Sequence, residues 1–221
     1  MIRRVMALVA GFSVSAGPAL AICPYPTPRA CSAYFESDVV FVGSVLSRGY
    51  SGDGEYLRFG VRVSRILRGS VGKTAVVYSG NDSGRLLWDV GEEYVVFANR
   101  QDGRLLSGGD CGPLSDPAKV AETIREIEGL GRGPSASIEG EVRSGPPDRP
   151  GLAGVAVRIR GGGRTYALRS DSRGSFRVEV PPGRYKVLVD PTLRRSDYNS
   201  TDLNDIRLVR GQCAQLQLVP N

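Results

Sequence analysis

The sequence predicts a mostly β protein built of barrel or sandwich domains. The 221 residues include 29 glycines and 14 prolines, which are typical of turns. Short runs of β-branched and aromatic residues recur along the chain, as they do in strands. Clusters of Gly, Ser, Asp and Asn separate these runs. The length and a hydrophobic content of 41% allow two small domains, each with its own core.

The chain before residue 130 is expected to form a strand-rich unit closed by one helix. Its strand candidates are residues 39–42, 59–63, 75–78 and 94–98. Asp116 is a typical N-cap residue, and Pro117 stands at the first helical position. Apolar residues then recur at helical spacing up to Gly129, where the predicted helix ends.

The chain after residue 130 is expected to form a β-sandwich. Residues 130–136 contain Gly, Pro and Ser and predict a linker. Apolar residues then alternate with other residues over 138–142, 155–159, 176–180 and 185–189. A sandwich domain is therefore predicted over residues 137–221.

The N-terminus has the pattern of a secretory signal peptide, residues 1–21. A positively charged start precedes a mainly apolar stretch over residues 5–20, and Ala19 and Ala21 form a small-residue cleavage signal. Cleavage after Ala21 leaves a secreted or periplasmic chain. A retained membrane anchor is the alternative, but the apolar run is short for a bilayer and contains Pro18. No later segment is long and apolar enough to span a membrane.

Four cysteines remain in the expected mature chain: Cys23, Cys31, Cys111 and Cys213. An even number in an oxidising compartment predicts disulfides, in one of three possible pairings. A zinc site is the alternative, but the sequence holds no C-x-x-C pair and no histidine. No metal and no other cofactor is therefore expected.

The absence of histidine excludes several kinds of catalysis, namely the Ser-His-Asp triad, the histidine proton shuttle and the H-E-x-x-H zinc site. Glu92 and Glu93 precede a predicted strand and fit a solvated turn better than an acid–base pair. Residues 161–163 are three glycines without the Lys-Ser/Thr of a P-loop, and they predict a hairpin tip. We therefore expect no enzyme activity and name no catalytic residue.

The basic charge lies in the second unit. Residues 22–129 carry 12 basic and 14 acidic groups, whereas residues 130–221 carry 15 basic and 9 acidic groups. The two-residue period of the predicted strands turns one set of cations outward: Arg158, Arg160, Arg177, Arg184 and Lys186. These five are candidates for anion binding. Alternation does not say whether they share one sheet, and charges that only keep the strands soluble are the alternative interpretation.

Six ordered segments of the first unit follow a known family pattern. They are residues 23–26, 31–35, 37–43, 59–69, 91–98 and 103–111. In order and spacing they resemble the netrin-like domain, the fold of the tissue inhibitors of metalloproteinases and of many bacterial secreted proteins. For residues 22–129 the resemblance implies a five-stranded barrel of the oligonucleotide- and oligosaccharide-binding type with a packed helix.

Four segments of the second unit follow another family pattern. They are residues 138–142, 151–157, 170–176 and 180–187. They resemble the carboxypeptidase regulatory-like domain, which implies a seven-stranded sandwich similar to transthyretin (prealbumin). Such modules accompany catalytic domains or stand alone, and no peptidase domain is present in this sequence.

The netrin-like resemblance implies a disulfide between Cys23 and Cys111. Cys31 resembles a family cysteine whose partner lies near the closing helix, but residues 116–129 contain no cysteine. Two alternatives remain for Cys31 and Cys213. Either they bond and tie the two domains together, or both stay as buried thiols.

These features predict a secreted, non-enzymatic binding or adhesion module. Its expected partner is an unidentified protein, or an anionic glycan or lipid of the cell envelope; nucleic acid is not expected because exposed aromatic residues are scarce. The alternative is a protease inhibitor or a regulatory subunit of a separate secreted enzyme. Inhibition in the animal relatives uses a cysteine as the first mature residue, whereas Ile22 takes that place here and Cys23 is second.

Overall fold

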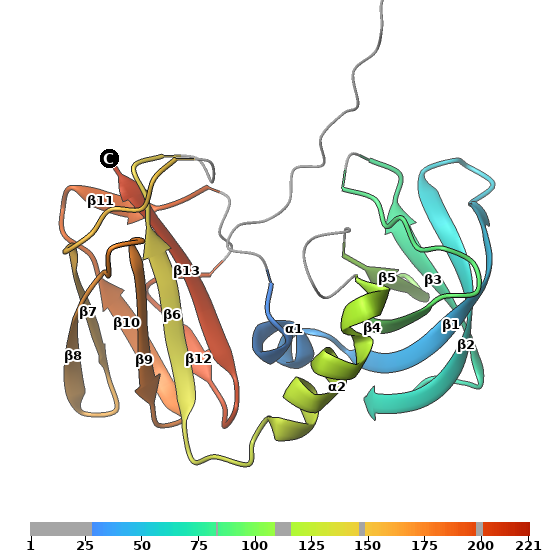
Figure 1. Cartoon of the computed structure of the whole chain (residues 1–221), viewed down its shortest axis with the longest axis horizontal. Coiled ribbons are helices and arrows are strands. Elements are labelled where there is room, and N and C mark those ends of the chain that lie inside the picture. Colours follow the sequence, from blue (N-terminus) through green and yellow to red (C-terminus); the bar gives the residue numbers. More distant parts are fainter. Residues whose placement is uncertain (1–27, 83, 109–115, 146–148, 198–200) are drawn as a thin grey trace, which may run out of the picture.

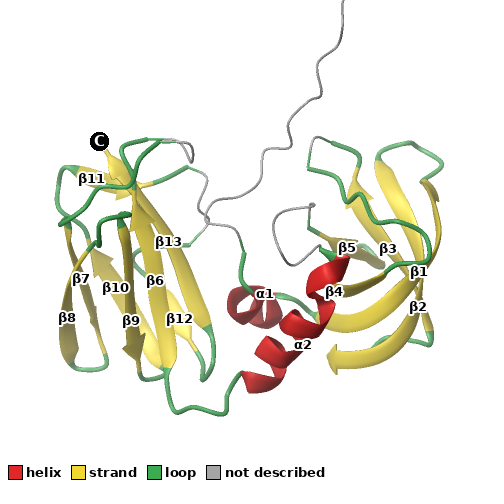
Figure 2. Cartoon of the chain, viewed as in Figure 1, coloured by secondary structure: helices red, strands yellow, loops and turns green. Residues whose placement is uncertain are grey.

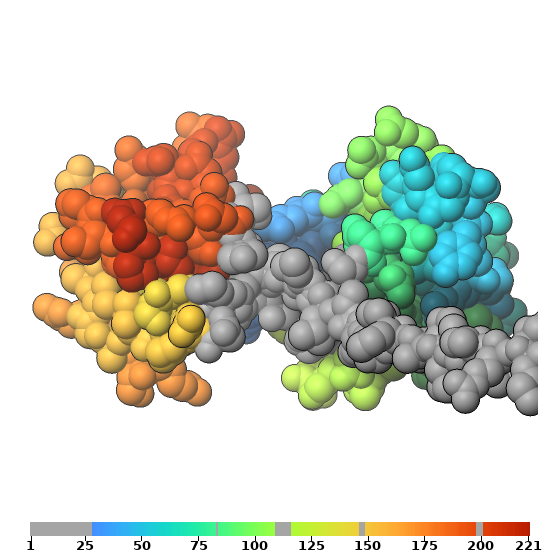
Figure 3. Space-filling model, turned by 90° about the horizontal axis from the view of Figure 1, so that it is seen from above, coloured from blue at the N-terminus to red at the C-terminus, as the bar shows by residue number. Residues whose placement is uncertain are grey.

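The computed structural model describes residues 28–82, 84–108, 116–145, 149–197 and 201–221. It is mostly β, as predicted, with a closed barrel followed by a two-sheet sandwich (Figures 1 and 2). Figure 3 shows the two units as separate lobes. The predicted signal peptide and its cleavage site lie outside the described residues, and so do Cys23 and Cys111.

The described part of the first unit forms a barrel of five strands. They are β1 (Val39–Tyr50), β2 (Tyr56–Arg68), β3 (Thr74–Gly80), β4 (Glu93–Gln101) and β5 (Arg104–Ser107). Their order around the barrel is β1-β2-β3-β5-β4, and β1 closes it by pairing with both β2 and β4. The pair β3–β5 is parallel and the other pairs are antiparallel. Buried side chains fill the interior, among them Phe41, Phe59, Trp88 and Val96. The predicted barrel is thus confirmed.

The turn between β4 and β5 determines where β5 begins. Asp102 and Gly103 both have positive φ angles, of 49° and 74°, and Gln101 pairs with Arg104 across the turn. Two residues with positive φ form a type I′ hairpin turn, for which Asp-Gly is a preferred sequence. The turn therefore places Arg104 as the first residue of β5.

Two α-helices lie between the barrel and the sandwich, α1 (Ala30–Glu36) and α2 (Val120–Gly129), the latter preceded by η2 (Pro117–Lys119) (Figure 2). They pack on the outer side of β1 and β4 through Ala30, Val40, Val42, Val95 and Ile127. The predicted N-cap is confirmed, because the Asp116 side chain accepts a hydrogen bond from the backbone N–H of Ala118 at 2.9 Å. The first turn is 3₁₀ rather than α, so the α-helix begins at Val120. Within the described residues, no helix has the length and apolar character needed to cross a membrane.

The second unit is a sandwich of two four-stranded sheets. Its strands are β6 (Ala136–Val142), β7 (Ala156–Gly161), β8 (Arg164–Arg169), β9 (Ser175–Val180), β10 (Gly183–Leu188), β11 (Leu193–Arg195), β12 (Ile206–Leu208) and β13 (Cys213–Pro220). One sheet has the order β12-β10-β7-β8 and the other β11-β13-β6-β9. The core between them includes Ile138, Ile159, Tyr185 and Leu216.

The sandwich class is confirmed, but its described residues form eight strands rather than the expected seven. The difference lies in β11 and β12, which have three residues each. Leu193, Ile206 and Leu208 are buried in the sandwich core, so both short strands complete the apolar contact between the sheets. A run of three residues is too short for its alternation to stand out in the sequence.

A disulfide joins α1 to strand β13 of the sandwich. Cys31 and Cys213 are buried and bonded to each other, 182 residues apart in sequence, so the alternative of two free thiols is wrong. The backbone N–H of Arg29 and the hydroxyl of Ser32 both donate to Oε1 of Gln215 at 2.9 Å. The sandwich thus supplies the hydrogen-bond acceptor that the start of α1 needs.

Replacing both Cys31 and Cys213 by serine is expected to destabilise the protein. The disulfide constrains a loop of 182 residues in the unfolded chain, which is worth on the order of 5 kcal/mol in the chain-entropy model. Urea unfolding followed by circular dichroism measures the difference from wild type. A peptide map of wild-type protein without reduction is the control and should contain the two cysteine peptides as one linked mass. Equal unfolding midpoints for variant and wild type would contradict the prediction.

Gly140 of β6 is expected to tolerate no side chain. A Cβ at this position would lie 2.4 Å from the carbonyl oxygen of Leu216 and 2.7 Å from the ring of Phe176. Gly140→Ala should therefore lower the free energy of unfolding by about 1–3 kcal/mol through overpacking. Gly49→Ala is the control, because Gly49 also lies in a strand and a Cβ there meets no atom within 4 Å. Thermal melting of both variants tests the prediction, which fails if they melt together.

Candidate anion-binding face

Four of the five predicted cations lie on the outer side of one sheet of the sandwich. Arg158 and Arg160 extend outward from β7, and Arg184 and Lys186 extend outward from β10. All four are exposed, because the residues that alternate with them are buried in the core: Val157, Ile159, Tyr185 and Val187.

Strand pairing brings these cations close to one another. Lys186 lies directly opposite Arg160, and Arg184 lies directly opposite Arg207 of β12. Paired strands are about 4.8 Å apart, so opposite cations are neighbours on the surface. Arg169 of β8 is exposed on the next strand, opposite Ala156. We call this set the basic face: Arg158, Arg160, Arg169, Arg184, Lys186 and Arg207.

Sequence reasoning missed two members of the basic face, Arg207 and Arg169. Arg207 stands between Ile206 and Leu208, and this three-residue alternation is the signal that could have found it. Arg169 follows Leu168 at the end of β8. Tyr166 and Leu168 are apolar residues two positions apart, and this spacing is a comparable signal.

Carboxylates oppose only part of the basic face. Asp205 lies 2.8 Å from Arg207 and 3.8 Å from Arg184. The hydrogen bond from Arg207 lowers the pKa of Asp205, and the same bond raises the pKa of Arg207. Among the described residues, no carboxylate forms an ion pair with Arg160 or Lys186.

Asp190 is a second carboxylate close to the basic face. Its pKa is lowered first by the backbone N–H of Thr192, next by the hydroxyl of Thr192, and also by the positive charge of Arg158. The two hydrogen bonds from Thr192 engage its Oδ1 at 2.9 Å and 2.7 Å. The positive charge of Arg158 therefore acts on the carboxylate of Asp190 without a direct ion pair between the two side chains.

Arg177, the fifth candidate, does not belong to the basic face, which answers the question that alternation left open. It lies on β9 in the opposite sheet, where its Nη1 is 3.2 Å from Oε2 of Glu139. Glu139 also accepts from Arg29 at 2.8 Å, and Arg29 lies 3.7 Å from Glu126 of α2. The reason is topological, since alternation gives the direction of a side chain but not the sheet that its strand joins.

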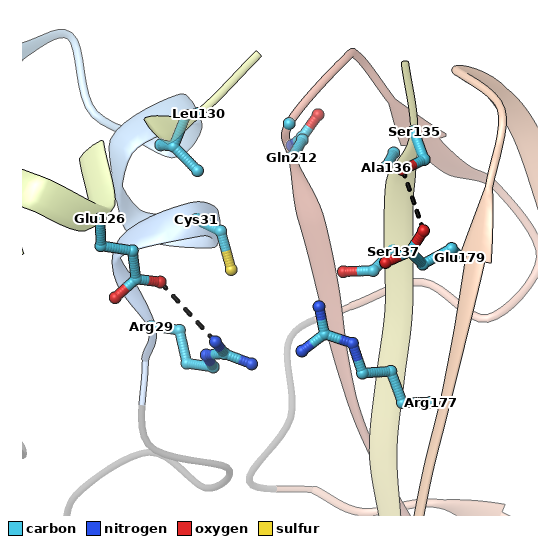
Figure 4. A pocket seen from close by; sticks show the side chains of 11 residues that line it. Arg29, Cys31, Glu126, Leu130, Ser135, Ala136, Ser137, Arg177, Glu179 and Gln212 are labelled. Carbon is cyan, nitrogen blue, oxygen red and sulfur yellow. Dashed lines mark hydrogen bonds and ion pairs between the residues drawn. The ribbon is translucent and has the colours of Figure 1, made fainter. Parts of the chain in front are cut away.

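The surroundings of Arg177 form the junction between the two units. Figure 4 shows a pocket here with Arg29, Cys31 and Glu126 on the helical side and Arg177 and Glu179 on the sandwich side. Its volume is about 170 Å³. The ion pair of Arg29 with Glu139 joins the two walls, and Arg177 shares this carboxylate from the neighbouring strand of the same sheet.

The basic face offers hydrogen-bond donors and positive charge, which suit the binding of anions. It contains no nucleophile or general base. Elsewhere, burial raises the pKa of Glu36 on α1, but no described residue makes a hydrogen bond with this carboxyl. General acid–base chemistry needs positioned partners, and Glu36 has none among the described residues.

Comparison with known proteins found little. No protein-family model matches the chain. No curated protein matches it. A solved structure with some similarity is the C-terminal fragment of the pilus adhesin SpaC from Lactobacillus rhamnosus GG, at 10% sequence identity, with 83% of this chain and 90% of that chain covered and a TM-score of 0.27. A TM-score of this size establishes neither a shared fold nor a shared function.

Removing the carboxylate of Asp205 is expected to strengthen anion binding. Asp205→Asn removes the negative charge that opposes Arg207 and Arg184, so affinity for heparin should rise by about fivefold at low salt, taking about 1 kcal/mol per charge. Asp89→Asn on the exposed barrel surface makes the same charge change away from the face and serves as the control. Elution from immobilised heparin measures the effect. Equal elution of both variants would show that Asp205 does not compete with the ligand.

Proposed function

We propose that this chain is a secreted, non-enzymatic binding module whose basic face holds an anionic polysaccharide of the cell envelope. The observation that supports the proposal is the gathering of six cations on one outer sheet surface, four of which have no described ion-pair partner. A row of exposed cations suits a polymer with repeated negative charges better than a small molecule, which needs an enclosing pocket.

The position of the basic face supports this role. In Figure 1, β7 and β8 lie on the side of the sandwich away from the barrel. The opposite sheet is turned toward α1 and uses Glu139 and Arg177 in the junction. A long polymer can therefore reach the basic face without displacing the barrel.

The proposal includes secretion by cleavage after Ala21. The Cys31–Cys213 disulfide supports it, since stable disulfides form mainly in oxidising compartments. It also includes a netrin-like domain over residues 22–129 and a carboxypeptidase regulatory-like domain over residues 137–221, with residues 130–136 as linker. The five-stranded barrel and the two-sheet sandwich support these assignments.

Neutralising the centre of the basic face is expected to abolish tight binding to heparin. The triple variant Arg158→Ala, Arg160→Ala, Lys186→Ala should lose on the order of 100-fold in affinity at low salt, at about 1 kcal/mol per cation. Binding of wild-type protein should weaken steeply with salt, because exposed charges are screened beyond about 8 Å at physiological ionic strength. Titration calorimetry over a range of salt concentrations measures both effects.

A matched variant separates this surface from the overall charge of the protein. Arg85→Ala, Arg125→Ala, Arg132→Ala removes three exposed cations outside the basic face and makes the same change in net charge. It should retain most of the wild-type affinity. Equal losses in both triple variants, or binding that does not respond to salt, would refute the proposal. Binding to anionic lipid vesicles but not to heparin would replace the polysaccharide by a membrane surface.

A further inference from the structure

The barrel contains two stacks of an arginine on two aromatic rings, and the first is explained by the fold. Arg68 lies over Tyr34 and Phe35, at 5.3 and 5.8 Å from the ring centroids. Its Nε donates to the carbonyl of Ser37 at 2.9 Å, and the Tyr34 hydroxyl donates to the carbonyl of Leu67 at 3.2 Å. Both polar groups of this stack have partners within the protein, and they hold α1 against β2.

The second stack has the same composition but different surroundings. Arg104 of β5 lies over Tyr56 of β2 and Tyr78 of β3, at 5.1 and 5.3 Å from the ring centroids. The two rings meet edge to face, 6.2 Å apart. All three side chains are half-buried on the outer side of the barrel. No described residue makes a hydrogen bond with the Arg104 guanidinium or with either hydroxyl.

The carboxylate of Asp53 lies near this second stack, and it already accepts two hydrogen bonds from its own loop. The Ser51 hydroxyl and the backbone N–H of Glu55 both donate to Asp53. These two bonds are the main causes that lower the pKa of Asp53, and the charge of Arg104 contributes a smaller part. Arg104 is thus within electrostatic reach of a carboxylate, but no group in the described part of the chain accepts from its guanidinium N–H donors.

A hollow of about 320 Å³ opens beside the stack, between β3 and β5. Tyr78 and Arg104 line it, together with Val76, Leu105 and a second cation, Arg100. One arm of Arg100 donates to the carbonyl of Ser70 at 2.5 Å, which holds this side chain in place. The volume is at the lower end of the range of small-molecule sites, about 300–1,000 Å³.

We propose that this hollow, with the Arg104 stack in its wall, binds a hexuronate, the carboxylated sugar unit of an acidic glycan. The Arg104 guanidinium, placed against two rings, has paired N–H donors that suit a carboxylate, and Arg100 adds a second positive charge. The hydroxyl of Tyr78, which lines the hollow, supplies a donor and acceptor for sugar hydroxyls. The aromatic and aliphatic walls pack against the C–H face of the sugar ring.

This site lies on the barrel, whereas the basic face lies on the sandwich. The two proposals therefore concern different surfaces. Heparin also contains hexuronate units, so the variants of each surface, rather than the choice of ligand, separate the two proposals. A short uronate oligosaccharide is small enough to occupy the hollow alone, while a long sulfated polymer tests the basic face.

The experiment is a calorimetric titration of the full-length protein with trigalacturonic acid and, as a neutral comparison, maltotriose. Wild-type protein should bind trigalacturonic acid at least tenfold more tightly than maltotriose, because a hydrogen-bonded charge pair is lost with the neutral sugar. Arg104→Gln should weaken trigalacturonic acid binding by about tenfold. Arg125→Gln on α2 makes the same charge change away from the hollow and should leave binding unchanged.

Two further variants keep the outcome decisive if Arg104→Gln alters the fold. Tyr78→Phe keeps the ring and the stack but removes one hydroxyl, and it should weaken binding severalfold with an unchanged melting temperature. Arg158→Ala, Arg160→Ala, Lys186→Ala should bind trigalacturonic acid like wild type.

Three results would overturn the proposal. They are the absence of trigalacturonic acid binding to wild-type protein, equal affinity of Arg104→Gln and Arg125→Gln, and loss of this binding in the basic-face variant. The last result would place the sugar on the sandwich instead. A lower melting temperature with unchanged affinity in Arg104→Gln would give the stack a purely structural role.

Discussion

The link between α1 and β13 is the constraint on which the arrangement of the two β units depends. The barrel and the sandwich each enclose their own apolar core, so neither core orients the other. The disulfide of Cys31 and Cys213 crosses between them, and the side chain of Gln215 caps the start of α1. The carboxylate of Glu139, only 13% exposed, accepts from both Arg29 and Arg177. A covalent bond surrounded by charge-assisted hydrogen bonds thus joins two units that share little apolar surface.

This junction also explains why the two outer faces of the sandwich differ in charge. The sheet that contains β6 and β9 is turned toward the helices, and its cation Arg177 is neutralised there by Glu139. The sheet that contains β7 and β10 has no such neighbour, and its cations extend into solvent. The cations of the basic face therefore lie on the sheet whose strands β7 and β8 are on the side of the sandwich away from the barrel (Figure 1).

The two arginine–aromatic stacks show how similar groups acquire different roles. Nε of Arg68 and the hydroxyl of Tyr34 donate to backbone carbonyls, so the fold itself engages a polar group of each side chain. Arg104 and Tyr78 lie at a hollow where the short β5 leaves part of β3 uncovered, and no described residue satisfies their donors. Hydrogen-bond satisfaction, rather than residue type, separates a structural contact from a surface available to a ligand.

The sequence by itself determined the properties that depend on near neighbours. Alternation placed Arg158, Arg160 and Lys186 outward, and Asp116 marked the start of a helix, because side-chain direction and capping are local effects. Only the tertiary structure decided that β9 carries Arg177 into a different sheet, that Cys31 finds Cys213, and that Tyr56, Tyr78 and Arg104 meet. These contacts join strands and helices far apart in the chain, and long-range pairing is set by how complete sheets and their cores pack together.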